Sequence, residues 1–578
     1  REAIRLHPNF PEAHGDLGVA LARLGRLGEA EAAFRMSIRL GPTAVTMYVN
    51  LATCLLSQGR HTDVEEWARQ ASLLDPKLGD PYRLVGCAFE ARGRIEQAET
   101  AFREAVRLDP RLAEAQYRLG SILHRLNRPK DAEPPLREAV RLRPTHASAW
   151  AALANLLESE NRAGEAIECA RQAIKHDPNC ADFHNTLGVA FASAEQPAEA
   201  EAAYREALRL DPRLVTAHSN LGNALRSLER LDDAERALRE ALKLKHDYPE
   251  AHNNLGIVLV QQGKDEEGMK HYDEALRLRP DYPEARLNRS LAYLGEGDFV
   301  RGWPEYEWRW KIRTVKLPQT GAPRWDGNPL PGKTILITSE QGLGDTINFI
   351  RYAPLVKARC GAVLVDCQEP LSRLVASCPG VDRVVPRGTA LPQHDATIPL
   401  LNLPGLLGFE AIPTPVPYLN PDTERVEHWR KELSGIEGLK VGITWQGSKV
   451  HRGDKLRSVR LTRFAPLAAV PGVTLFSLQK GPGTEQLTDG SASWMNVIDL
   501  GSRTTADMAD AAAVMMNLDF VVSVDTAVVH VAGALGRPVW VALPYSPDWR
   551  WMRTGDSTRW YPTMRLFRQT IRADWDGV

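Results

Sequence analysis

The chain has 578 residues, enough for several domains, and 43% of them are hydrophobic, as folded domains require. Its formal net charge of −1 removes the electrostatic argument for nucleic acid or an anionic membrane as a partner. No apolar run reaches the roughly 20 residues of a membrane-spanning helix, and the seven scattered cysteines show no metal-ligand spacing. These features favour a cytoplasmic protein with reduced thiols.

A proline recurs every 34 residues through the first half of the chain, from Pro8 to Pro212, and Pro280 keeps the same step. Two columns of small side chains share this period, one beginning at Gly18 and the other at Ala30. A fixed period of this length indicates stacked supersecondary units. Small residues 12 positions apart suit the contact between two paired helices, and the proline is expected to end the second helix.

This pattern resembles the tetratricopeptide repeat (TPR), in which antiparallel helix pairs stack into a superhelix. The resemblance predicts about nine full repeats within residues 1–312, after a partial helix at the start, and with no initiator methionine we expect a fragment. On the predicted concave face, Asn220, Asn254 and Asn288 each stand two positions before a small residue. In protein O-GlcNAc transferases, a similar asparagine column holds the backbone of an extended acceptor peptide. The resemblance therefore implies peptide contacts for these amides, the alternative being polar side chains that face water.

The repeat texture ends near residue 312, where Trp303, Trp308 and Trp310 stand close together. These tryptophans are predicted to cap the last apolar face of the solenoid; the alternative is that they line the path of an acceptor. A Pro/Gly-rich linker, 313–332, follows.

Short β-rich runs then alternate with helices, which predicts a parallel α/β architecture. A proline-rich break ending at Pro421 divides this region into halves, 333–421 and 422–578. Two Rossmann-like halves that face a cleft form the GT-B arrangement, with ligands at the carboxyl ends of the strands. The first half is assigned to the acceptor and the second to a nucleotide-sugar. The predicted strands are residues 334–338, 362–365, 441–444, 474–477, 520–524 and 539–542.

The first predicted strand is followed by a glycine-containing turn and a helix, GLGDTINFIRYAPLVKAR. In the simplest interpretation, Asp345 at the helix start is an N-cap. The segment also resembles the start of bacterial heptosyltransferases, whose aspartate at this point is the proposed general base. The resemblance implies that Asp345 takes the proton of an acceptor hydroxyl, with Gly344 beside the donor.

Cationic residues, including Lys449 and Arg457, crowd the loop after the first strand of the second half. Basic loops usually face solvent, but this one follows a strand end, where a nucleotide diphosphate would sit. In metal-free GT-B enzymes, cations and helix N-termini neutralise the leaving diphosphate, so both residues are predicted to bind the donor. Gln479 and Lys480 close the next strand and are predicted to contact the base or ribose, or else to form an ordinary turn.

The segment VDTAVVHVAGALGRPV resembles the heptosyltransferase signature D-T-G-x-x-H-x-A-A-x-x-x-x-P, with Ala527 in place of glycine. It predicts a strand, a sharp turn and a helix of small residues. The backbone N–H groups of Thr526 and Ala527 would face a phosphate, whereas Asp525 would bond sugar hydroxyls or cap the helix. His530 would face the cleft or be a buried structural residue. The loop 544–551 is predicted either to cover the sugar or to anchor the C-terminal segment through its tryptophans.

Together the motifs resemble bacterial TPR-repeat glycosyltransferases of the heptosyltransferase type, similar in architecture to protein O-GlcNAc transferase. The resemblance implies inverting, metal-independent transfer of a sugar from a nucleotide-sugar to Ser or Thr of a protein held in the TPR groove. A D-x-D motif occurs only beyond the last strand, so neither a metal nor another cofactor is expected. The alternatives are an enzyme for glycan or lipid-linked acceptors, with the TPRs for docking, and a TPR scaffold without catalysis.

Overall fold

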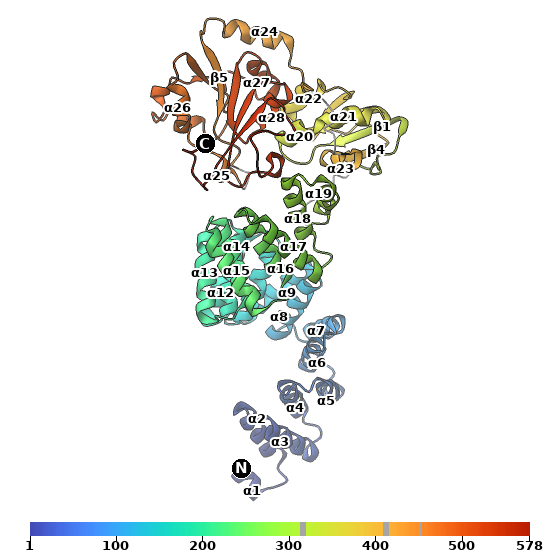
Figure 1. The fold of residues 1–578 in the computed structure, drawn as a ribbon. Coiled ribbons are helices and arrows are strands. Elements are labelled where there is room, and N and C mark those ends of the chain that lie inside the picture. Colours follow the sequence, from blue (N-terminus) through green and yellow to red (C-terminus); the bar gives the residue numbers. More distant parts are fainter. Residues whose placement is uncertain (313–319, 409–415, 450–452) are drawn as a thin grey trace. The chain divides into compact units, whose positions relative to one another are not determined.

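The computed structural model describes residues 1–312, 320–408, 416–449 and 453–578. The predicted linker and the proline-rich break therefore lie partly outside the described residues. The chain forms two compact units, Arg1–Asp247 (unit 1) and Tyr248–Val578 (unit 2), and Figure 1 labels their elements. None of the helices in the described ranges combines the length and the apolar character that crossing a bilayer would take.

Unit 1 is built from helix pairs that follow the 34-residue period, after a short helix α1 (Glu2–Leu6). The pairs are α2 (Pro11–Arg23) with α3 (Leu27–Leu40), α4 (Val45–Ser57) with α5 (His61–Leu74), α6 (Asp80–Ala91) with α7 (Ile95–Leu108), α8 (Ala113–Arg125) with α9 (Pro129–Leu142), α10 (Ala147–Ser159) with α11 (Ala163–His176), α12 (Ala181–Ser193) with α13 (Pro197–Leu210), and α14 (Val215–Ser227) with α15 (Leu231–Leu244).

The small columns lie where paired helices touch. A Cβ built on Gly18 would come within 2.6 Å of the Phe34 ring, and Ala30 on the partner helix is fully buried. The recurrent proline lies two residues beyond the second helix of a pair, as Pro42 does after Leu40. Both features agree with the prediction from spacing.

Two further helix pairs belong to unit 2: α16 (Pro249–Gln261) with α17 (Asp265–Leu278), and α18 (Pro283–Glu296) with α19 (Phe299–Tyr306). The 3-10 helix η1 (Glu307–Lys311) follows directly. Trp303 is 2% exposed and packs edge-on against Phe349 and Trp549, with ring centroids 6.0 and 5.5 Å away. The predicted sealing of the last repeat face is therefore present at Trp303. The end of the repeat region at residue 312, expected from the repeat pattern, stays a prediction.

The first α/β part of unit 2 has a parallel sheet in the order β3-β2-β1-β4. Its first strand lies inside the sheet, with the later strands added on both sides, so the direction of winding reverses between β1 and β4. The strands are β1 (Leu330–Thr338), β2 (Cys360–Cys367), β3 (Arg383–Pro386) and β4 (Ala396–Pro399), and the helices are α20 (Leu343–Phe349), α21 (Ala353–Lys357), α22 (Ser372–Ala376) and α23 (Leu403–Leu407).

The second α/β part has a six-stranded parallel sheet in the order β10-β9-β8-β5-β6-β7. Numbered by appearance, this order is 6-5-4-1-2-3, the arrangement of dinucleotide-binding folds. The strands are β5 (Leu439–Thr444), β6 (Val473–Ser477), β7 (Ile498–Asp499), β8 (Phe520–Val524), β9 (Val539–Leu543) and β10 (Met564–Arg568), and the helices are α24 (Thr423–Glu432), α25 (Asp454–Arg457), α26 (Ala465–Ala468), α27 (Met508–Met515) and α28 (Ala527–Ala534).

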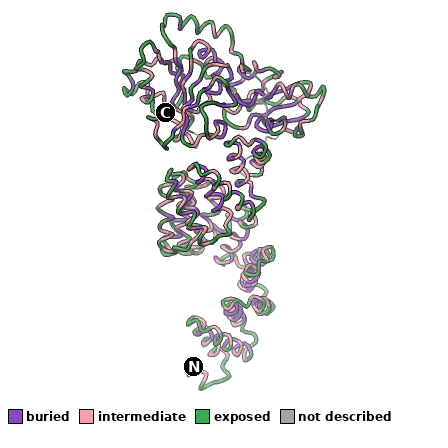
Figure 2. Tube along the Cα trace, viewed as in Figure 1, coloured by how far each residue is buried: buried purple, intermediate pink, exposed green. Residues whose placement is uncertain are grey.

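The predicted fold class, TPR helix pairs followed by an α/β region with parallel sheets, is confirmed, and all six predicted strands are present. Buried residues run along the central strands, whereas α24 is mostly exposed (Figure 2). The sequence did not reveal β3, β4, β7 and β10, which have two to five residues each. Strands of two to four residues, such as β3, β4 and β7, are too brief for a periodic signal, whereas β10 is as long as strands that were predicted.

Candidate active site

The winding of the second sheet reverses between β5 and β8. At this switch point the Thr444 and Ser523 hydroxyls are hydrogen-bonded to each other across the two strands. The loops that leave the two strand ends contain the predicted basic residues on one side and the turn Asp525–Ala527 on the other. Open α/β sheets bind ligands at such points because the two loops diverge there.

The basic loop brings one of its two predicted cations to the switch point. Arg457 ends α25, its side chain is only 17% exposed, and Asp454 holds it at 3.7 Å. The Nε atom of Arg457 is buried without a hydrogen-bond partner. Lys449 is exposed in the preceding turn. Arg457 is therefore positioned by the fold, whereas Lys449 has a surface position.

The turn between β8 and α28 places a perturbed carboxyl beside Arg457. Thr526, not Asp525, occupies the N-cap position, and no side chain caps this helix start. Burial, assisted by the nearby Asp548, raises the pKa of Asp525 to about 6, although Arg457 and Arg550 act against this shift. When a carboxyl in such surroundings ionises, it destabilises the fold. Its presence therefore makes Asp525 a functional candidate. Ala527, the first residue of α28, presents its backbone N–H at this turn.

His530 is enclosed within the protein. Its ring is 5% exposed, its Nδ1 lies 3.1 Å from the Tyr561 hydroxyl, and it stacks on Trp551 at 5.2 Å. Burial lowers the pKa of His530 to about 3, so the ring is neutral at physiological pH. This geometry fits the buried structural interpretation, and a contact of His530 with the donor stays a prediction.

Asp345 lies where α20 packs on α28. Its Oδ2 accepts a hydrogen bond from the Gly342 N–H at 2.9 Å, and the side chain is 16% exposed. A Cβ built on Gly344 would lie 2.7 Å from His530 Cδ2, so glycine allows the two helices to approach. The close approach joins the start of α20, after β1, to the β8–α28 region.

Arg550, to which no sequence motif pointed, connects these groups. It lies in the 3-10 helix η8 (Trp549–Trp551) after β9 and forms an ion pair with Asp345 Oδ1. It also pairs with Asp548 at 2.7 Å, and its guanidinium lies 4.5 Å from the Trp549 ring centroid. Burial opposes the charge, but Asp345 and Asp548 together raise the pKa of Arg550. Trp549 and Trp551 are buried, which favours the anchoring interpretation of this loop.

Gln479 and Lys480 are engaged by the protein itself. Gln479 is 4% exposed; its Oε1 accepts from the Trp445 and Gln446 N–H groups, and its Nε2 donates to the Gln446 and Pro482 carbonyls. Lys480 donates to the Thr505 carbonyl, and burial lowers its pKa. A donor would have to displace these bonds, so the ordinary-turn interpretation describes the geometry, and donor contacts stay predictions.

An open pocket of about 800 Å³ lies within unit 2 beside Arg550. One wall comes from the helix pairs and carries aliphatic side chains together with Asn288 and Trp310. The opposite wall comes from the end of β1 and from the loop before and within η8. The residues that define the walls are Ile257, Val260, Leu287 and Leu291 on the helical side, and Glu340, Gln341, Asp548, Arg550 and Arg553 on the other.

Two of the three predicted asparagines, Asn220 and Asn288, form amide links to the preceding repeat, whereas Asn254 bonds within its own helix. Asn288 Nδ2 donates to Asn253 Oδ1 at 2.9 Å in unit 2, and Asn220 Nδ2 donates to Asn185 Oδ1 at 3.0 Å in unit 1. Asn254 Oδ1 accepts from Asn253 at 3.4 Å. An amide carries two N–H groups, so this link leaves Asn288 one more donor in the pocket wall. Peptide contacts by the three asparagines stay predictions.

A buried ion pair closes the pocket toward the first sheet. Arg309 from η1 and Glu340 after β1 are 3.0 Å apart, with side chains 4% and 7% exposed, and Arg309 also donates to Asn402 after β4. Burial raises the pKa of Glu340 even though Arg309 acts against the shift. The last repeat is thereby joined to the switch point between β1 and β4.

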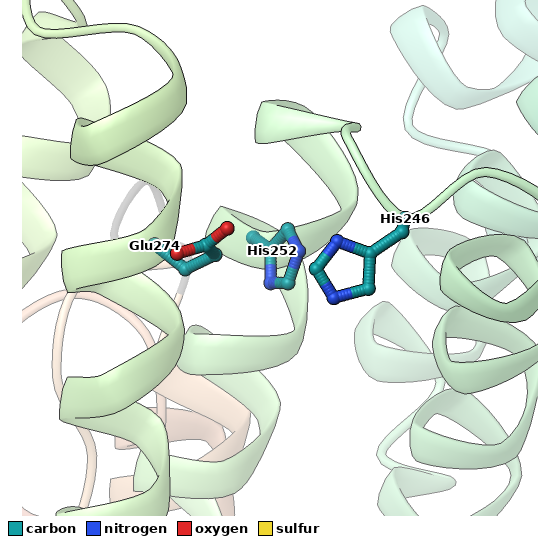
Figure 3. Close-up of side chains that lie close together, drawn as sticks. All are labelled: His246, His252 and Glu274. Atoms are coloured by element: carbon teal, nitrogen blue, oxygen red, sulfur yellow. The ribbon is translucent and has the colours of Figure 1, made fainter.

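A histidine pair lies between α16 and α17. The Nδ1 atoms of His252 and His271 are 2.9 Å apart, and Figure 3 shows Glu274 on α17 facing His252. The third residue of the figure, His246, belongs to unit 1. His252 and Glu274 thus supply two candidate metal ligands from unit 2, whereas a structural zinc site takes four. We assign no metal site to this pair.

Comparison with known families gives two matches along the chain. The tetratricopeptide repeat family matches residues 1–45, 86–147, 151–214 and 219–283. The family described as glycosyltransferase family 9 (heptosyltransferase) matches residues 483–546, which include the Asp525–Ala527 turn and His530. The chain joins TPRs to a glycosyltransferase family 9 domain.

A curated relative is protein FlbA of Caulobacter vibrioides, 29% identical over 301 residues, which are 47% of this chain and 49% of FlbA. The chain thus spans about half the length of that relative.

Solved structures resemble parts of the chain. The chain of the APC/C hetero-tetramer Cut9–Hcn1 is 18% identical with a TM-score of 0.39, covering 46% of this chain and 52% of that one. The thermophilic TPR protein TTC0263 of Thermus thermophilus is 25% identical with a TM-score of 0.28, covering 32% of this chain and 100% of that one. TM-scores below 0.5 describe only a partial likeness.

Proposed function

We propose that this TPR glycosyltransferase moves a sugar from a nucleotide-sugar to a Ser or Thr hydroxyl of a protein, with inversion and without a metal ion, in a GT-B arrangement. The observation that carries the proposal is the cluster Asp345–Arg550–Asp548 beside Asp525. It joins a carboxylate that follows β1 to the turn at the switch point of the second sheet. In this proposal the base and the diphosphate-binding turn lie at one place, as a single-displacement transfer requires.

In this reaction the acceptor oxygen attacks the anomeric carbon while the bond from that carbon to the diphosphate breaks. Asp345 takes the proton of the acceptor hydroxyl. Arg457, assisted by Lys449 and by the backbone N–H groups of Thr526 and Ala527, stabilises the charge that develops on the leaving diphosphate. Asp525 bonds sugar hydroxyls, because a phosphate placed beside it would be repelled.

The pocket within unit 2 supports a protein acceptor over a glycan. Its helical wall is aliphatic at Ile257, Leu287 and Leu291, which suits apolar side chains better than sugar hydroxyls. Asn288 in the same wall supplies an amide that recognises main chain without regard to the side chains. An extended peptide could therefore lie along α16 and α18 and present its hydroxyl to Asp345.

The first test is nucleotide recognition. We expect one or more of ADP, GDP, UDP, CDP and dTDP to bind the chain by calorimetry, and Asp345→Asn to retain that binding while losing turnover of the matching nucleotide-sugar. Retained turnover would refute Asp345 as the base. If none of the five diphosphates binds, the chain is a scaffold rather than an enzyme.

The second test is the acceptor. The matching nucleotide-sugar with a radiolabelled sugar is offered to a pool of cellular proteins and, separately, to purified glycans and glycolipids. A protein acceptor modified on Ser or Thr should carry label that alkaline β-elimination releases. Label confined to glycans or glycolipids would instead establish the heptosyltransferase-like alternative, with the TPRs used for docking.

A further inference from the structure

Both oxygens of Asp345 are engaged in this structure. Oδ2 accepts from the Gly342 N–H at 2.9 Å, and Oδ1 is ion-paired with Arg550. A general base needs a lone pair directed at the acceptor hydroxyl. In the observed geometry an arginine of the donor-binding half occupies one of the two positions from which Asp345 would act.

Arg550 also has the properties of a diphosphate ligand. It lies in the loop after β9, next to β8, and its charge affects the pKa values of both Asp525 and His530. Its Nε is buried without a hydrogen-bond partner in the wall of the pocket. A guanidinium binds phosphate oxygens in a bidentate manner.

We propose that Arg550 is a donor-binding residue that blocks Asp345 until the donor arrives. When a nucleoside diphosphate group occupies the β8–α28 turn, Arg550 exchanges the Asp345 carboxylate for diphosphate oxygens, and Asp345 becomes available as a base. Asp548 holds the other side of the guanidinium at 2.7 Å, so Arg550 remains near the turn when it releases Asp345. The proposal rests on the proposed function and adds an order to it, with the donor binding before proton transfer is possible.

The direction in which one substitution changes the diphosphate affinity separates this model from one in which the ion pair is only structural. If Asp345 competes with the diphosphate for Arg550, Asp345→Asn removes the competitor, and the diphosphate should bind at least about three-fold more tightly. The amide oxygen of asparagine can still accept from the Gly342 N–H, so the local turn is kept. Arg550→Gln should weaken binding by about ten-fold or more, because a charged contact is lost.

The double variant Asp345→Asn/Arg550→Gln completes the cycle. It should bind the diphosphate with the same affinity as Arg550→Gln alone, because without Arg550 there is no arginine for which Asp345 and the diphosphate compete. Asp265→Asn is the matched control: Asp265 is also paired with a pocket arginine, Arg553, at 3.6 Å, but is not linked to Asp345. We expect the affinity of this control to be unchanged.

The measurement is calorimetry on the full chain with whichever of the five nucleoside diphosphates binds it, with the fold of each variant checked by circular dichroism. Arg550→Lys serves as a second variant that retains the charge, and it should bind more weakly than the unsubstituted chain. If Asp345→Asn leaves the affinity unchanged or lowers it while the unsubstituted chain binds, the exchange model is overturned and the proposed function stands. If none of the diphosphates binds the unsubstituted chain, both fail.

Discussion

Gly344→Ala probes the contact between α20 and α28, which brings the two α/β parts of unit 2 together. The new methyl would lie 2.7 Å from His530 Cδ2 and 3.2 Å from Nε2, whereas ordinary contacts begin near 3.4 Å. His530 cannot move freely because Tyr561 and Trp551 hold its ring. Overpacking of this kind costs about 1–3 kcal/mol, and replacing glycine within a helix returns about 0.5–1 kcal/mol.

A matched control isolates the steric part. Gly164 is the second residue of α11, as Gly344 is of α20, but a Cβ on Gly164 meets nothing within 4 Å. Gly164→Ala therefore measures only the gain in stability that comes from replacing a glycine within a helix. In urea unfolding followed by circular dichroism and tryptophan fluorescence, Gly344→Ala should be less stable than this control predicts by about 1–3 kcal/mol. Equal stabilisation by both substitutions would show that α20 and α28 do not pack as described.

Three further substitutions test other features. Asp525→Asn should stabilise the protein by up to about 3 kcal/mol above pH 6. Because the folded-state pKa of Asp525 is raised from 3.8 to about 6, ionisation costs stability as pH rises through that window, so the gain in melting temperature should vanish near pH 4. Arg309→Met should cost unit 2 about 3–5 kcal/mol at neutral pH in urea unfolding, because it leaves the Glu340 charge buried, and less at acidic pH, because Glu340, whose pKa burial raises, becomes protonated. Asn288→Ala should weaken binding of protein acceptors up to about ten-fold in a pull-down titration, with nucleotide affinity unchanged. An equal loss of both affinities would contradict the wall assignment.

The fold could be predicted because its signals are periodic. The 34-residue step places Gly18 against Phe34 through local helix geometry alone, and strand–helix alternation indicates parallel sheets. The strand order could not be predicted, because β3 and β7 have four and two residues, and a single sequence holds no record of which strands are neighbours.

The site was predictable where a motif continues along the chain. The segment from Val524 to His530 could be read as the end of a strand, a turn and a helix, although the sequence does not say whether His530 faces a cleft or a core. Arg550 was missed because its partner Asp345 is 205 residues away. The sequence Trp549-Arg550-Trp551 is the same whether the arginine lies on the surface or forms an ion pair with a carboxylate. Gln479 is the opposite case, a predicted site residue at a strand end whose amide instead hydrogen-bonds to the backbone of neighbouring loops.

The helices α16–α19 belong to the same compact unit as the two sheets. Cutting the chain where repeats give way to strands would remove Arg309 from its ion pair with Glu340 and take away one wall of the pocket in unit 2. Helix pairs upstream of Tyr248 are thus the part of the array that insertion or deletion could lengthen or shorten over evolutionary time. The final two pairs are instead an integral part of unit 2.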